Sequence, residues 1–321
     1  MKTNLVTLFA VLAMFSASLV ACGEKENNGE GEGEGESLVG GFNSIGASNS
    51  LFSVAPGKQV RFSRSNLRYN PFLNVWGFAD NQYDYVGKDN EKIAADYNGW
   101  IDLFGWGTSG WNGGAVAYQP WATDAVDTHY WVGGNWTNGL FGPGADGDWG
   151  VYNAVANGGN VTGMWRTLKI DEWKYLLDSN EVRAGKWGLG QIGKDSYGLV
   201  ILPDEWKQPD GVTFSPSDGT SGEGSPLNTY SYDQWNKMES AGAVFLPSAS
   251  LRTELQVSDD FSGNHRGTYW MASYYYRTTA YTLTFDTWYL NESEGDVTLR
   301  TDMTRPRHVG CSVRLVQDQK N

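Results

Sequence analysis

Residues 165–177 read WRTLKIDEWKYLL, and this stretch carries the clearest fold information in the chain. Asp171 and Glu172 stand where the first turns of a helix would be, and a helix dipole favours negative charge there. Ile170 and Leu177 recur at helical spacing with a tryptophan between them, so one face of this helix is apolar. The stretch therefore predicts a short amphipathic helix packed on a core.

Capping signals predict two more helices. Asp148 can accept a hydrogen bond at the start of a helix that runs through Val155 and stops at the glycines 158 and 159. Ser231 and Gln234 form a capping-box pattern ahead of a helix that Gly242 ends.

Short apolar or alternating runs predict strands, and they outnumber the helices. They are residues 52–54, 59–62, 75–78, 100–104, 198–202, 243–246, 268–271, 280–285, 297–299 and 312–316. Residues 105–147 are rich in Gly, Trp, Asn and Asp without periodicity, which indicates a long ordered loop. Few helices among many short strands predict an α+β fold in one domain without internal repeats.

The composition limits the function. The 321 residues include 41 Gly, and 14% are aromatic, so the chain is neither disordered nor mostly helical. Two cysteines and three scattered histidines argue against zinc–thiolate, iron–sulfur and histidine-based metal centres, and we expect no cofactor. Calcium stays open, because acidic residues at 80–89 and 146–148 offer oxygen ligands without EF-hand spacing. The net charge of −13 argues against a nucleic-acid partner.

The N-terminal residues predict the compartment. Residues 1–21, with Lys2 and an apolar run, are typical of a secretory signal peptide. The sequence LVAC at 19–22 resembles the lipobox of bacterial lipoproteins, which implies lipidation of Cys22 and an outer-membrane anchor; an ordinary signal peptide with a chance cysteine is the alternative. Residues 22–50 with their Gly–Glu repeats predict a solvated tether, and residues 51–321 the folded domain.

Several motifs resemble known families. The acidic residues directly after Cys22 resemble the surface-export signal of Bacteroidetes lipoproteins, which implies exposure on the cell surface. DLFGWGTSG at 102–110 and DWGVYN at 148–153 are similar to a large group of such secreted lipoproteins. Residues 165–177 resemble the GWRLPTxxEWxxL element of C-type-lectin-like domains of the formylglycine-generating-enzyme kind. GCSVRLV at 310–316 is similar to the close of Fibrobacter major paralogous (FISUMP) domains.

The resemblance covers residues 52–317 and implies a C-type-lectin-like fold. Such a fold has small twisted antiparallel sheets, two or three helices and long ordered loops. Loops of this kind can change their residues without loss of the core.

The sequence favours binding over catalysis, and we expect no enzyme. The formylglycine-generating relatives use cysteine chemistry, but only Cys311 remains once Cys22 is lipidated, and no histidine is close to it in the sequence. The acidic pairs at 171–172 and 259–260 are better explained as helix-terminal and turn charges. A glycoside hydrolase is therefore the weaker alternative.

The candidate binding residues lie near the C-terminus. Along the strand at 280–285, Tyr281, Leu283 and Phe285 are predicted to face the core, and the intervening residues to face solvent. Tyr, Trp and Arg are enriched in binding hot spots. The predicted exposed patch comprises Tyr274, Tyr275, Tyr276, Arg277, Thr278, Thr279, Thr282, Thr284, Asp286, Trp288, Tyr289, Arg305 and His308, within a region that also contains the loop 304–308.

These observations predict a surface lipoprotein that binds an external protein or glycan through its C-terminal face. Residues 269–316 also resemble the variable region of proteins diversified by diversity-generating retroelements, which implies a face whose exposed residues are rewritten. The alternative within binding is a glycan-capture component of polysaccharide uptake, in which tryptophans of the 105–147 loop serve as sugar platforms.

Overall fold

The computed structural model describes residues 41–112, 116–178, 180–217, 226–258, 265–287 and 299–320. These residues belong to one compact unit. It is of the mixed α+β class, with small, mainly antiparallel sheets and few helices, as the sequence predicts. Within the described ranges, no helix is both long enough and apolar enough to cross a membrane.

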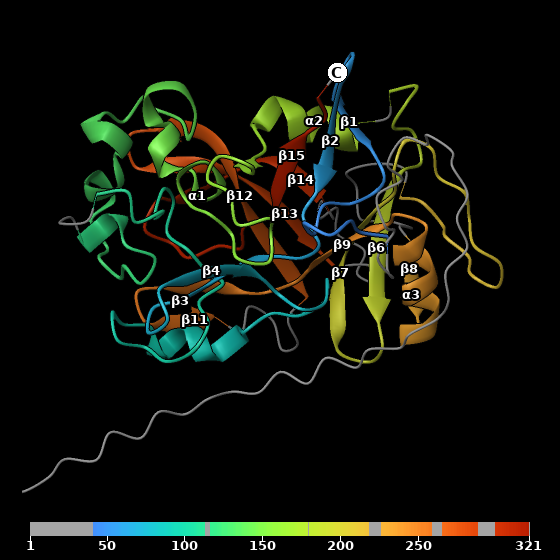
Figure 1. Ribbon diagram of the computed structural model, residues 1–321, viewed down its shortest axis with the longest axis horizontal. Helices are drawn as coiled ribbons and strands as arrows, with labels where there is room; N and C mark the ends of the chain where they lie inside the picture. Colours follow the sequence, from blue (N-terminus) through green and yellow to red (C-terminus); the bar gives the residue numbers. More distant parts are fainter. Residues whose placement is uncertain are drawn as a thin grey trace, which may run out of the picture. The chain divides into compact units, whose positions relative to one another are not determined.

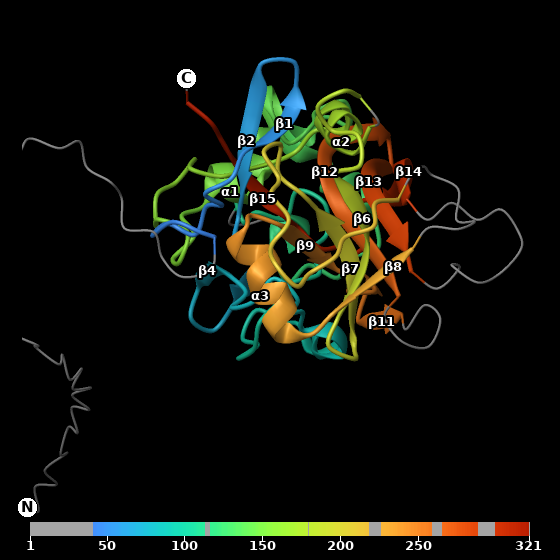
Figure 2. The same cartoon turned by 90° about the vertical axis from the view of Figure 1, so that its right-hand side faces the viewer.

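One sheet joins the two ends of the domain. Its strand order is β1 (Phe52–Ala55), β2 (Lys58–Phe62), β15 (Leu315–Asp318) and β5 (Arg166–Thr167), and each pair is antiparallel. The β1–β2 hairpin and the helix α2 (Ile170–Leu177) are confirmed as predicted, and α2 packs on β1 (Figures 1 and 2).

A second sheet has the order β8 (Leu227–Tyr230), β6 (Trp187–Ile192), β7 (Ser196–Ile201) and β9 (Val244–Pro247), with β6 and β8 parallel. The helix α3 (Tyr232–Ser240) follows β8 directly (Figure 2). The sequence pattern does not predict β6, because its two glycines weaken a strand pattern. A Cβ at Gly190 would lie 2.7 Å from Val200 Cγ2, so glycine is required where these strands approach each other.

The third sheet consists of β12 (Arg266–Tyr276), β13 (Thr279–Asp286) and β14 (Leu299–Pro306), all antiparallel. Two small hairpins complete the strands: β3 (Leu67–Asn70) with β4 (Val75–Phe78), and β10 (Leu251–Thr253) with β11 (Gln256–Ser258). Besides the α-helices there are short 3-10 helices, namely η1 (Gly87–Lys92), η2 (Val116–Tyr118), η3 (Asp127–Tyr130), η4 (Val132–Gly134) and η5 (Gly142–Gly147). Four of these five lie in the predicted loop at 105–147.

The predicted caps of α1 and α3 are both present, but the predicted length of α1 is wrong. Ser231 and Gln234 form the capping box of α3 as predicted, with Ser231 Oγ accepting from Gln234 N at 3.2 Å. Asp148 caps α1 (Trp149–Tyr152), but the prediction that this helix runs through Val155 is wrong. Val155 instead forms a parallel bridge with Trp76, which pulls the chain out of the helix.

The folded domain begins earlier than the predicted boundary at residue 51. Ala47 is buried and forms an antiparallel bridge with Ser63. The backbone of Gly41 lies so close to α3 that a Cβ there would meet Glu239 O at 2.1 Å. Residues 41–50 therefore pack on the domain, although their small polar composition is typical of a tether.

Two apolar clusters cover opposite faces of the β12–β13 pair. One contains Trp270 and Ala280, together with the buried Trp106 and Trp149. The other contains residues of the opposite face, among them Tyr269, Met271, Leu283 and Phe285. The β12–β13 pair is therefore interior on both sides over most of its length, whereas β14 is mostly half-buried.

Candidate functional site

The turn between β12 and β13 projects a run of exposed aromatic and polar side chains. Tyr275 is 53% exposed and Tyr276 is 56% exposed, and Arg277 and Thr278 are exposed beside them. Tyr274 is half-buried and pairs across the hairpin with Ala280. The structure thus brings the predicted residues 274–279 together at the surface.

The loop at 105–147 supports this turn from one side. The Trp136 ring lies 6.0 Å from Tyr274 and 5.6 Å from Tyr276, in edge-on geometry in both pairs. Trp131 Nε1 donates a hydrogen bond to the carbonyl oxygen of Arg277 at 2.6 Å. We call the set Tyr274, Tyr275, Tyr276, Arg277, Trp131 and Trp136 the hairpin surface. Nothing in the sequence indicates that the loop tryptophans lie beside the C-terminal tyrosines, and the structure brings them into contact.

Arg307 fixes the hairpin surface from below. Its guanidinium is buried and donates to the carbonyl oxygens of Trp136 at 2.7 Å and Tyr276 at 3.1 Å. It also lies 4.5 Å from the centre of the Trp106 ring, and burial lowers the pKa of Arg307 to about 10. The prediction that the whole 304–308 loop belongs to an exposed patch is therefore wrong at Arg307, which is structural.

The other predicted residues of that loop lie at the edge of the hairpin surface. Arg305 is half-buried, and its backbone pairs with Ala280. His308 is also half-buried, and its Nδ1 lies 2.7 Å from Asp127 Oδ1. Asp127 belongs to η3, so this contact is a second link between the 105–147 loop and the C-terminal segment.

The predicted exposure of Thr282, Thr284 and Asp286 is wrong. Thr282 is fully buried, and the other two are at most 8% exposed. β13 is the central strand of its sheet and both faces of the β12–β13 pair meet apolar clusters, so the strand's alternation does not create a solvent face. Asp286 instead accepts from Arg266 Nε at 3.0 Å. Trp288 and Tyr289 lie outside the described residues, as does Cys22.

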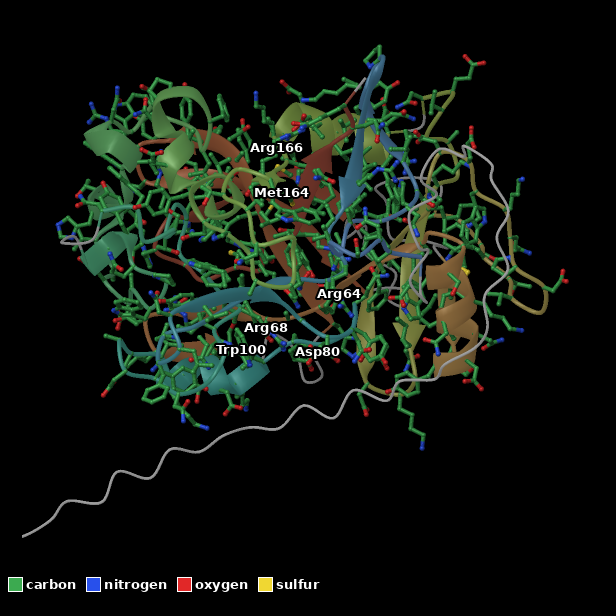
Figure 3. All side chains as sticks on the ribbon, in the orientation of Figure 1. Arg64, Arg68, Asp80, Trp100, Met164 and Arg166 are labelled. Carbon is green, nitrogen blue, oxygen red and sulfur yellow. The ribbon has the colours of Figure 1, made fainter. Side chains whose placement is uncertain are left out.

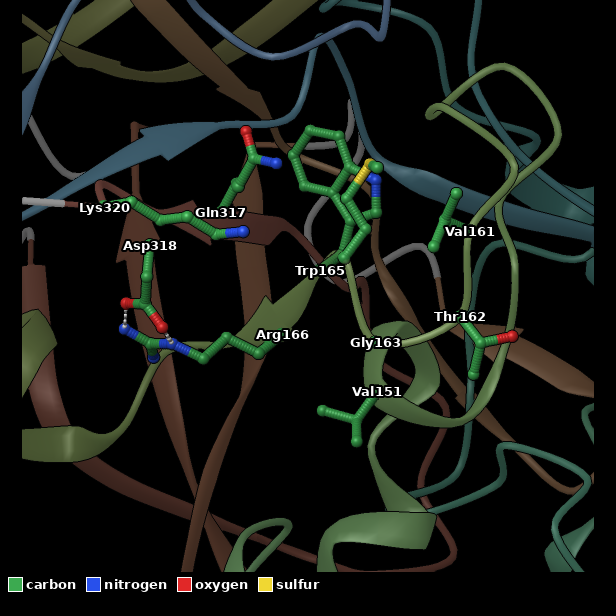
Figure 4. Close-up of a pocket in the computed structure, with 10 residues that line it drawn as sticks. Val151, Val161, Thr162, Gly163, Trp165, Arg166, Gln317, Asp318 and Lys320 are labelled. Carbon is green, nitrogen blue, oxygen red and sulfur yellow. Dashed lines mark hydrogen bonds and ion pairs between the residues drawn. The ribbon is translucent and has the colours of Figure 1, made fainter.

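A shallow pocket of about 400 Å³ lies beside β5 and β15 and is unrelated to the predicted residues. Figure 4 shows an apolar wall that includes Trp165 and Val161, facing Arg166, Asp318 and Lys320. Most of these charges are already paired within the protein, because Arg166 forms ion pairs with Asp318 at 2.6 Å and with Glu172 at 2.7 Å. Glu172 also pairs with Lys58 at 2.7 Å, so this network ties α2 to the first sheet.

The groups considered for catalysis and calcium have structural partners. Cys311 is buried, and burial raises the pKa of its thiol. Both oxygens of the Asp148 carboxylate accept backbone hydrogen bonds, from Gly150 at 3.0 Å and Thr167 at 2.8 Å. Asp80 pairs with Arg68 at 3.0 Å. Among the described residues, no group of three or more His, Cys, Asp or Glu side chains could hold a metal ion.

No family model, curated protein or solved structure matches this chain.

Proposed function

We propose that this chain is a surface-anchored lipoprotein that binds an external protein through the hairpin surface. The observation that carries the proposal is the pair of exposed tyrosines, Tyr275 and Tyr276, held beside Arg277 on a turn that a second, distant loop supports. Exposed tyrosines and an arginine on a pre-organised turn combine large contact area with a small loss of conformational entropy on binding. The C-type-lectin-like and FISUMP resemblance, with a turn open to diversification, remains part of this proposal.

The packing of the loop tryptophans favours a protein ligand over the alternative of glycan capture. A sugar ring stacks on an open aromatic face, but the half-buried Trp136 ring is in edge-to-face contact with Tyr274 and Tyr276 and has the Arg277 guanidinium 6.0 Å from its centre. Trp106 is fully buried and carries Arg307 on its ring. Trp106 and Trp136 thus contribute to packing, whereas Tyr275 and Tyr276 are exposed.

The proposed anchor has its own test. Metabolic labelling with a palmitate analogue should mark the full chain, and Cys22→Ala should abolish that label. Protease treatment of intact cells should then remove the wild-type domain if it faces the medium. Unchanged labelling of Cys22→Ala would contradict the lipoprotein assignment.

Binding is tested with cells that display the full chain. We expect adhesion to surfaces coated with extracellular-matrix proteins, and a drop of roughly thirtyfold in affinity for Tyr276→Ala, since a hot-spot tyrosine contributes about 2 kcal/mol. Tyr232→Ala is the matched control, because Tyr232 is 52% exposed but lies on α3. Adhesion to polysaccharide coatings alone would favour the glycan-capture alternative, and equal effects of both variants would contradict the proposed site.

A further inference from the structure

A second, polar pocket of about 250 Å³ lies where the folded domain begins. Its lining comes from five separate parts of the chain and is polar except for one aromatic ring. The lining residues are Phe42, Asn43, Ser44, Gly46, Arg64, Asp80, Asn81, Asn157 and Glu239. Arg64 and Asp80, which line it, are labelled in Figure 3. None of these residues belongs to the hairpin surface.

The polar walls of this pocket are held in place by the protein itself. Asn157 pairs with both backbone groups of Phe78, accepting from its N at 2.7 Å and donating to its O at 2.9 Å. Asn43 Oδ1 accepts from the backbone N of Ala47 at 2.9 Å. A Cβ at Gly46 would lie 3.0 Å from the backbone oxygen of Asn157, and the φ of +71° at Gly46 favours glycine, so the two backbones are closely packed there. The site is therefore formed before any ligand arrives, which reduces the entropic cost of binding.

The charges around the pocket nearly cancel. Asp80 is paired with Arg68 at 3.0 Å, and the Arg64 guanidinium donates to the Asp80 carbonyl oxygen at 3.0 Å. Arg64 and Glu239 both line the pocket, yet no ion pair joins them within the described part of the chain. Glu239 Oε1 accepts from Gln82 at 2.9 Å, and burial raises the pKa of Glu239. The pocket therefore has no large net charge that would attract a strongly anionic or a strongly cationic ligand.

The lining of the pocket supplies both hydrogen-bond donors and acceptors. Arg64 supplies N–H donors, Glu239 and Asp80 supply acceptor oxygens, and Ser44 supplies a hydroxyl that can do both. Asn43 Nδ2 and Ser44 Oγ make no hydrogen bond to any described residue, so their hydrogen-bonding capacity is left for a ligand. A set of this kind matches hydroxyl groups, since each hydroxyl both donates and accepts.

We propose that this pocket binds one neutral sugar unit, a pyranose ring with several free hydroxyls. The volume is below the range usual for drug-sized ligands and suits a ligand of about a dozen heavy atoms. Phe42 supplies the apolar ring against which the C–H face of a sugar can pack, while the planar polar side chains bind its hydroxyls. This site is independent of the hairpin surface and of the protein ligand proposed there.

The test uses the full chain and methyl glycosides of glucose, galactose, mannose and N-acetylglucosamine as probes. Saturation-transfer NMR should detect binding of at least one of them, and calorimetry should give its affinity. Arg64→Met and Glu239→Gln should each weaken that binding about tenfold, because each removes a charged hydrogen-bonding partner. The matched controls on α3, Lys237→Met and Asp233→Asn, should leave the affinity unchanged, since both side chains are exposed outside the pocket.

A third variant tests the proposal even if Arg64→Met or Glu239→Gln fails to fold. Ser44→Leu removes no charge and places a larger side chain at the rim of the pocket, so it should abolish binding while circular dichroism stays unchanged. Absence of binding by all four glycosides would overturn the proposal, as would binding that Ser44→Leu leaves intact. Tighter binding of glucose 6-phosphate than of methyl glucoside would overturn the assignment to a neutral sugar.

Discussion

The buried guanidinium of Arg307 donates a hydrogen bond to the carbonyl oxygen of Trp136 at 2.7 Å, across 171 residues of sequence. The same guanidinium donates to Tyr276 O, and the backbone N of Arg307 donates to Thr278 O at 2.9 Å. One residue thus holds the long loop, the hairpin turn and the C-terminal segment together. The hairpin surface depends on a residue that is itself inaccessible to a ligand.

Replacement of Arg307 should therefore damage the domain. Arg307→Met leaves the carbonyl oxygens of Tyr130, Trp136 and Tyr276 without their charged donor, and we expect a loss of about 3 kcal/mol in the free energy of unfolding. Urea denaturation followed by tryptophan fluorescence measures this loss. Arg300→Met is the control, because its exposed pair with Asp302 contributes at most about 0.5 kcal/mol. Equal effects of the two variants would contradict the linking role of Arg307.

The exposed tyrosines should behave in the opposite way. Tyr275→Ala and Tyr276→Ala remove side chains that are more than half exposed, so we expect changes in the free energy of unfolding within about 0.5 kcal/mol. Thermal unfolding tests this expectation. A loss above 2 kcal/mol in either variant would mean that these rings stabilise the fold, and adhesion data from that variant could not then be assigned to binding.

Asp148 should give the protein a distinctive pH dependence. Burial raises its pKa to about 6, despite hydrogen bonds from Thr167 and Gly150 that act to lower it. The pKa of Asp148 in the folded state lies above its value in the unfolded state, so the native protein holds the carboxyl proton to a higher pH. The free energy of unfolding therefore decreases as the pH rises from about 4 to about 6. Over this pH range the free energy of unfolding should decrease by about 3 kcal/mol in total.

The measurement compares wild type with Asp148→Ser, which keeps a helix-capping oxygen but cannot titrate. The difference between their free energies of unfolding should shrink across this pH range and stay constant above it. Carbon-13 NMR of the aspartate carboxyls should show one group titrating near pH 6 that the variant lacks. A difference that grows with pH would refute the raised pKa.

The thiol of Cys311 should be unreactive in the native protein. The residue is fully buried, its backbone bridges that of Phe104, and burial raises the pKa of its thiol. Iodoacetamide followed by peptide mapping should leave the Cys311 peptide unmodified until urea is added. Rapid modification without denaturant would show that the site opens, and would revive a role for this cysteine in chemistry.

Local signals in the sequence identify the elements whose determinants lie within a few residues. The capping box at Ser231, the Asp148 cap and the hairpin over residues 52–62 are of this kind. The burial of Thr282 is different, because the β13 alternation does not reveal that both faces of the sheet are covered. The same limit hid the contact of Trp136 with Tyr276 and the pocket around Arg64, which join segments far apart in the chain. Exposure of the turn at 275–278 was predictable, since a polar hairpin turn has few ways to be buried.

The place of β15 has a consequence for biogenesis. This strand, Leu315–Asp318, lies between β2 and β5, so residues far along the chain occupy an interior position in a sheet whose first strand begins at residue 52. A nascent chain that lacks them cannot complete that sheet, and pairing over such a sequence separation is slow. The strands β2 and β5 therefore cannot share a sheet until residues 315–318 are in place, and this sheet is expected to form late in folding.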